Sequence, residues 1–184
     1  MEGTDNEWDR ATYREAGALL ARLHTQLTVV DDGEFARRQK ADTLAWLTRP
    51  HRIDPQAVAV LADEVERWPT PLSVVVPTHG DWQPRNWLAH GGRLAIIDFG
   101  RADLRPAYTD LGRLAAQQFL EQPELEPAFL DGYGSDPRES ASWMRLRIRE
   151  AIGTAAWAFK VGDERYEQQG HQMIAAVVED LGRG

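Results

Sequence analysis

Two short stretches in the middle of the chain decide its fold, THGDWQPRN at residues 78–86 and IIDFG at residues 96–100. Apolar residues lie between them on either side of Gly91-Gly92, a pattern typical of a β-hairpin. If the turn is centred on Gly92, Asn86 and Asp98 face each other across the two strands. The sequence therefore predicts a small β element that holds an amide and a carboxylate close together.

These side chains have the chemistry of a magnesium site. Hard oxygen ligands from one amide and one carboxylate, with room for waters and phosphates, suit Mg²⁺ better than zinc or calcium. Asp81 lies five residues before Asn86, on the loop that leads into the same edge. From there its carboxylate can accept the proton of an attacking hydroxyl, which is the positioning role that phosphoryl transfer requires. We therefore predict Asn86 and Asp98 as metal ligands beside a catalytic Asp81.

Helical patterns flank the β element on both sides. The apolar spacing and the turn residues predict helices over residues 8–27, 35–48, from Asp54-Pro55 to about residue 68, 110–120, 138–159, and from about 163 to 181. A strand is expected over residues 72–76, and a proline-rich joint at Pro123 and Pro127. The fold class is thus α+β and mostly helical, in a single domain over residues 1–184.

Composition excludes several classes of protein. The 184 residues contain no cysteine, so disulfide frameworks, thiolate zinc sites and cysteine nucleophiles are ruled out. A net charge of -8 argues against a nucleic-acid partner and is compatible with a cationic ligand. The acidic N-terminus differs from a signal peptide, and no run of 18 apolar residues occurs. We expect a cytoplasmic protein without a nucleic-acid or membrane partner.

The motifs resemble those of a known family. HGD at residues 79–81, Asn86 after four intervening residues, and DFG at residues 98–100 resemble the catalytic and metal-binding segments of the aminoglycoside phosphotransferase family. That family has a protein-kinase-like fold and includes choline, homoserine and other small-molecule kinases. EAGALLARLH at residues 15–24 is similar to its helix upstream of the catalytic loop, and Asp110-Leu111 to its aspartate-leucine pair.

The resemblance, which covers about residues 8–160, implies both an activity and the roles of residues. The whole enzyme would transfer the γ-phosphoryl group of ATP (or GTP) to a hydroxyl of a small molecule, and antibiotic resistance is among the family's roles. Asp81 would be the catalytic base or hydroxyl orienter, and Asn86 and Asp98 the Mg²⁺ ligands. His79 and Asp110 would be the scaffold of the site.

One half of a kinase has no counterpart in this sequence. No glycine-rich loop precedes Asp81, and the two lysines, Lys40 and Lys160, fall in predicted helices rather than on a strand. The resemblance therefore implies a C-terminal lobe without the N-terminal β lobe that binds nucleotide. Three explanations stay open: a fragment of a longer kinase, a natural lone lobe that works with a separate N-lobe chain or by self-association, and a degenerate protein that binds without catalysis.

Substrate recognition is expected from the acceptor-side helices at about residues 138–181, because that part of the family varies with the acceptor. The acceptor would be a small hydroxylated molecule, and Glu150 could hold an amino group if it is cationic. Trp82 and Arg85 are further candidates for substrate contact. Each has a structural alternative: Glu150 and Arg85 as members of ion pairs, and Trp82 as a core residue. No ligand-like spacing links the other histidines, His24, His51, His90 and His171.

Two other functions are compatible with the same residues. The first is a non-catalytic binding or regulatory module derived from such a lobe. The second is a metal-dependent hydrolase that uses His79, Asp81, Asn86 and Asp98 around one ion. The hydrolase is less favoured, because the set contains only one histidine.

Overall fold

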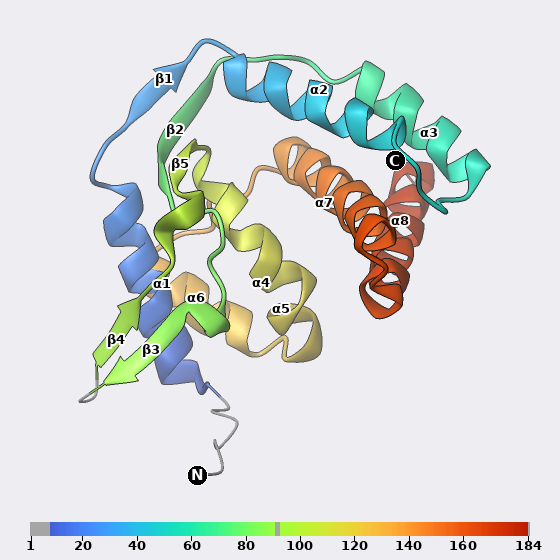
Figure 1. The fold of residues 1–184 in the computed structure, drawn as a ribbon. Coiled ribbons are helices and arrows are strands. Elements are labelled where there is room, and N and C mark those ends of the chain that lie inside the picture. Colours follow the sequence, from blue (N-terminus) through green and yellow to red (C-terminus); the bar gives the residue numbers. More distant parts are fainter. Residues whose placement is uncertain (1–7, 91–92, 184) are drawn as a thin grey trace. The chain divides into compact units, whose positions relative to one another are not determined.

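The structure is a computed structural model that describes residues 8–90 and 93–183. Figure 1 shows the helices and strands in sequence colours. The chain forms two compact units. Unit 1 comprises the described residues up to 30 together with 74–137, and unit 2 comprises 31–73 together with those from 138 onward. That residues 1–184 act as a single domain stays a prediction.

Two packed helices form the base of unit 1. They are α1 (Arg10–His24) and α6 (Leu125–Tyr133), which run side by side in Figure 1. Asp9 caps α1, because its carboxylate accepts a hydrogen bond from the Thr12 amide at 2.9 Å. The helices approach so closely at Gly17 that a Cβ there would lie 2.1 Å from the Phe129 carbonyl oxygen. The amphipathic helix predicted over residues 8–27 is thus confirmed, with shorter ends.

The strands form two small sheets. One has the strand order β1 (Val29–Asp31), β2 (Ser73–Thr78) and β5 (Asp103–Arg105). β2 and β5 are antiparallel, with Thr78 opposite Asp103. The other sheet is the expected hairpin of β3 (Trp87–His90) and β4 (Arg93–Ile96), whose turn at Gly91-Gly92 lies outside the described residues. β1 and β5 were not predicted, because three-residue strands are too short to show a period.

The segment after the hairpin differs from the prediction. Instead of one helix over residues 110–120, it contains several short helices: η2 (Phe99–Arg101), η3 (Ala107–Leu111), α4 (Gly112–Ala116) and α5 (Gln118–Glu121). One further short helix, η1 (Pro84–Asn86), precedes the hairpin. The predicted joint is confirmed at Pro123, which lies between α5 and α6, but is wrong at Pro127, which lies in the first turn of α6. The amides of a first helical turn have no partner within the helix, so proline loses nothing there.

Unit 2 consists of four helices among the described residues: α2 (Glu34–Leu47), α3 (Pro55–Glu66), α7 (Ser140–Val161) and α8 (Glu164–Arg183). Asp54 caps α3 as its sequence predicts, accepting a hydrogen bond from Ala57 at 2.9 Å. The core of this unit is mostly aliphatic and joins α3 and its flanking residues to α7 and α8. Its buried members are Ile53, Leu61, Val65, Trp68, Ile148, Ala151, Ile152, Ala155, Ile174 and Val177. The chain is therefore mostly helical and α+β. Across the described ranges, every helix is too short or too polar to cross a membrane.

Aromatic side chains fill the core of unit 1 under the hairpin. Tyr13 from α1 meets the edge of Trp87, with ring centroids 5.1 Å apart, and also lies 6.1 Å from Phe119. Trp82 and Trp87 are each 2% exposed. Because these rings are large and interlocked, they hold the loop of residues 79–86 against the helices.

Candidate active site

The loop that carries Asp81 begins with a turn that only glycine fits. β2 ends at Thr78, whose hydroxyl donates to the Asp103 carbonyl at 2.8 Å. Gly80 then adopts φ +79°, and a Cβ there would lie 2.3 Å from the Arg101 carbonyl oxygen. L-residues with side chains rarely adopt this conformation, and here the backbone of Arg101 also fills the space. The turn brings Asp81 next to the start of the hairpin.

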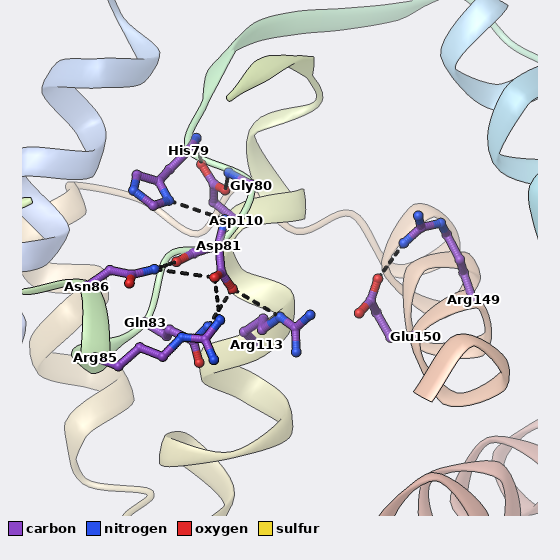
Figure 2. Close-up of polar contacts among 10 residues, drawn as sticks. All are labelled: His79, Gly80, Asp81, Gln83, Arg85, Asn86, Asp110, Arg113, Arg149 and Glu150. Atoms are coloured by element: carbon purple, nitrogen blue, oxygen red, sulfur yellow. Dashed lines mark hydrogen bonds and ion pairs between the residues drawn. The ribbon is translucent and has the colours of Figure 1, made fainter. Parts of the chain in front are cut away.

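Asp110 holds this turn in place through hydrogen bonds. Its side chain is fully buried and accepts hydrogen bonds from the His79 amide at 2.8 Å and the Gly80 amide at 2.6 Å (Figure 2). A buried carboxylate with two backbone donors is fixed in position and fixes those amides in turn. This geometry fits the scaffold role predicted for Asp110.

The contacts of His79 assign one tautomer of its ring. Its Nε2 lies 2.9 Å from the Ile97 carbonyl, which can only accept, so Nε2 carries the hydrogen. Its Nδ1 lies 3.2 Å from the Asp81 amide, which can only donate, so Nδ1 accepts. Both ring nitrogens are therefore engaged, and His79 connects the loop to the end of the hairpin as a scaffold residue should. A metal-ligand role, as the hydrolase alternative requires, does not fit this arrangement.

His24 is a member of the site that the sequence analysis missed. It is 4% exposed, and its Nε2 lies 3.1 Å from the Asp110 carboxylate. Its Nδ1 lies 2.8 Å from the Tyr133 hydroxyl. Burial, with the charge of Asp110, raises the pKa of Tyr133 to about 12, so the hydroxyl stays protonated at neutral pH. The clue was its place at the end of the family-like helix stretch, residues 15–24.

Asp81 is buried and surrounded by donors. It is 3% exposed. Its Oδ2 accepts from Arg85 at 2.6 Å and from the Asn86 amide at 3.3 Å, and its Oδ1 accepts from Gln83. The Nε of Arg113, on α4, lies 3.3 Å from Oδ1. Figure 2 shows these side chains converging on one carboxylate. Neither Gln83 nor Arg113 was predicted from the sequence.

The electrostatic environment keeps Asp81 ionised. Burial raises its pKa, but the hydrogen bond and charge of Arg85, with the charges of Arg113 and Arg101, outweigh it, so the pKa lies below the usual 3.8. At neutral pH, Asp81 is therefore a carboxylate that can orient a hydroxyl.

The two predicted metal ligands occupy different positions from those expected. Trp87 pairs with Ile96, so Asn86 stands opposite Ile97, whose amide donates to the Asn86 carbonyl at 3.0 Å. The expectation that Asn86 faces Asp98 across the strands is therefore wrong by one residue. Asp98 instead follows the strand, at φ +63°, where it is exposed and caps the Gly100 amide at 3.4 Å.

The donor set nevertheless fits magnesium. Asn86 donates through Nδ2 to the Asp81 carbonyl at 2.8 Å, so Oδ1 is the atom that it can offer to a cation. Within residues 8–90 and 93–183, no three acidic or histidine side chains gather into a metal site. One amide and one carboxylate leave most positions to water and phosphate, which is how proteins usually hold Mg²⁺.

The predicted substrate contacts are divided between the units. Trp82 packs against the His79 ring, with centroids 5.5 Å apart, and its burial is that of a core residue. Arg85 is exposed and paired with Asp81. Glu150 lies in unit 2 on α7, paired with Arg149, whereas the other predicted site residues lie in unit 1.

Comparison with known families identifies the group to which this site belongs. The sequence pattern of the APH family, described as the phosphotransferase enzyme family, matches residues 3–146. The chain belongs to this family. The match includes the whole segment that carries Asp81, Asn86, Asp98 and Asp110. Resemblance to aminoglycoside phosphotransferases is thereby confirmed. No curated protein sequence matches the chain.

Solved structures of family-like enzymes share the fold. A spectinomycin phosphotransferase in complex with ADP and spectinomycin superposes with a TM-score of 0.68 at 12% identity, over 96% of this chain and 68% of that one. A choline/ethanolamine kinase family protein from Mesorhizobium loti gives 0.61 at 18% identity, over 92% and 62%. A glucosamine kinase gives 0.63 at 13% identity, over 93% and 53%. The chain thus spans 53 to 68% of the length of these structures.

Proposed function

We propose that this chain carries the metal and acceptor-hydroxyl half of a small-molecule phosphotransferase. The observation that carries the proposal is the buried, ionised Asp81 held beside Asn86 by a fixed loop. Catalysis of phosphoryl transfer consists mainly of positioning the reacting groups and neutralising charge, and the hydrogen bonds of this loop position Asp81.

Each residue has a defined part in the proposed reaction. Asp81 accepts a hydrogen bond from the acceptor hydroxyl and aligns its oxygen for attack on the γ-phosphorus of ATP or GTP. Asn86 and Asp98 would hold Mg²⁺, which supplies charge neutralisation on the phosphate oxygens when bound. His79 and Asp110 keep the loop in place through its backbone.

The nucleotide contacts remain part of the proposal. Both lysines lie on helices, Lys40 on α2 and Lys160 in the last turn of α7, so neither is the strand lysine of a kinase. In the whole enzyme, we infer that a second lobe supplies the adenine and phosphate-covering contacts. That lobe belongs to a longer form of this protein or to a separate chain, unless self-association of this chain builds the nucleotide contacts instead.

Phosphorus NMR of the chain with Mg·ATP tests the proposal. The acceptors are those of the similar structures: spectinomycin, choline and glucosamine. Because the second lobe would supply the adenine contacts, we expect the chain alone at high ATP concentration to give a slowly growing phosphoester signal that depends on the acceptor and disappears in Asp81→Asn. The control is Asp63→Asn, which changes an aspartate paired with an arginine at the same 2.6 Å, but on the exposed face of α3.

The other outcomes favour the alternatives. Nucleotide binding without transfer to any acceptor would favour the binding module. Cleavage of a phosphoester such as p-nitrophenyl phosphate without ATP would favour the hydrolase. Equal transfer by the wild-type protein and Asp81→Asn would remove Asp81 from the mechanism.

A further inference from the structure

The surface above Asp81 is cationic. Side chains of Arg85 and Arg113 are 63% and 30% exposed, whereas that of Asp81 is 4% exposed. The charge of Arg101 also acts on this carboxylate. The cluster contrasts with the net charge of -8 of the chain. A ligand that approaches Asp81 within unit 1 therefore meets guanidinium groups first.

Asp81 has little capacity left for another donor. A carboxylate offers about four lone-pair positions. Gln83 donates to Oδ1, which also forms an ion pair with Arg113, and Arg85 and Asn86 donate to Oδ2. An acceptor hydroxyl therefore needs one of these donors to leave. Gln83 and Asn86 are buried within the same short loop, so the two longer, more exposed arginines are the groups that can swing away.

We propose that Arg85 and Arg113 form a binding site for a phosphate-type oxyanion over Asp81, whose arrival draws the guanidinium groups away and frees the carboxylate for the hydroxyl. The inference rests on the proposed function and deepens it. Guanidinium groups bind phosphate oxygens through paired, charge-assisted hydrogen bonds. The oxyanion comes either from the phosphoryl group of the nucleotide or from an anionic group on the acceptor.

An ion pair elsewhere in the chain provides the matched comparison. Arg67 contacts Asp63 at 2.6 Å with the same i,i+4 spacing as Arg85 and Asp81, and its side chain is equally exposed, at 63%. Asp63, however, is 69% exposed, whereas Asp81 is buried. An arginine-aspartate pair alone is therefore an ordinary surface feature, and the buried carboxylate beneath two arginines distinguishes the candidate site.

Isothermal titration with inorganic phosphate tests the site directly. The proteins are the wild-type chain, Arg85→Gln, Arg113→Gln and the control Arg67→Gln, each first checked for unchanged thermal unfolding. We expect phosphate to bind the wild-type chain and Arg67→Gln equally, and each site variant about tenfold more weakly. The absence of phosphate binding by the wild-type chain, or equal binding by all four proteins, would overturn the proposal.

Further titrations identify the source of the oxyanion. If the acceptor supplies it, glucose 6-phosphate binds more tightly than glucose, and the site variants lose this difference. If the nucleotide supplies it, the variants weaken Mg·ATP binding and leave the two sugars alike. Either result supports the site. If the wild-type chain binds the two sugars equally and the variants bind Mg·ATP as the wild type does, the site is contradicted. Phosphate binding without any phosphoryl transfer would reject the proposed function alone, while transfer by a chain that ignores phosphate would reject this inference alone.

Discussion

Single residues of the catalytic loop show how a short motif becomes a site. Gly80 permits the turn, Asp110 holds its amides, and His79 holds the amide of Asp81. The sequence predicted the presence of these residues and their approximate neighbourhood. It did not predict that His24 and Arg113 join them, because both come from distant elements and neither has a motif spacing to Asp81.

Replacing Gly80 by alanine should destabilise the protein. The added Cβ would clash with the Arg101 backbone at φ +79°, so we expect a loss of about 2 to 4 kcal/mol in the free energy of unfolding. Urea denaturation measures it. Gly153→Ala, in α7 with no atom within 4 Å of the new Cβ, should instead gain about 0.5 to 1 kcal/mol. An unchanged stability of Gly80→Ala would contradict the described turn.

Asp81 should make stability depend on acidic pH. Its pKa is lowered on folding, so it binds protons more weakly in the folded state. Its stabilising contribution is therefore complete above about pH 5 and is lost as the pH falls through the folded value. Urea titrations of wild type and Asp81→Asn should show a difference in unfolding free energy that is constant from pH 5 to 7. Below about pH 4, the unfolding free energy of the wild type should fall relative to that of the variant. A difference independent of pH would mean that Asp81 is not held by its arginines.

At the scale of elements, long helices were predicted more accurately than short helices and strands. Long helices such as α3 and α7 were predicted within a few residues, since their apolar period and caps are written in the sequence. The hairpin was also confirmed, but its register was off by one, because two adjacent glycines do not fix the centre of a turn. Short 3-10 helices and three-residue strands arise from tertiary contacts, so their sequences carry no pattern of their own.

Packing between α7 and α8 should depend on Gly170. A Cβ at this position would lie 2.5 Å from the Ala155 backbone nitrogen. We expect Gly170→Ala to cost about 1 to 3 kcal/mol, measured by urea denaturation. Gly182 lies in the last turn of the same helix with open space around it, and helix propensity contributes little at a helix end, so Gly182→Ala should be nearly neutral. Equal stability of both variants would show that the two helices do not pack as described.

The hydrogen bond between His24 on α1 and Tyr133 on α6 should help to stabilise the catalytic loop through Asp110. Tyr133→Phe removes the hydroxyl that hydrogen-bonds to the buried His24, and we expect a loss of about 1 kcal/mol in unfolding free energy. The amide resonances of residues 79–81 should shift as well, since His24 contacts Asp110. Proton-nitrogen correlation spectra would record this shift, and shifts confined to α1 and α6 would separate the network from the loop.

At the scale of the whole molecule, unit 1 concentrates the proposed chemistry. Asp81, Asn86, Asp98 and Asp110 all lie in this unit, and the family match spans residues 3–146. The acceptor was beyond prediction from sequence, because the motifs report the reaction and not the molecule that enters. The net charge of the chain did not indicate the acceptor either, since arginines lie over Asp81 although the chain as a whole is acidic.

The proposed function requires that a metal held by Asn86 and Asp98 bind the nucleotide phosphates to this chain. Proton-nitrogen correlation spectra of the labelled chain, titrated with millimolar ATP with and without Mg²⁺, test it most directly. We expect Mg²⁺-dependent shifts at the amides of residues 81, 86 and 98–100 that disappear in Asp98→Asn. Shifts that ignore Mg²⁺, that persist in Asp98→Asn, or that do not occur at all would contradict the claim.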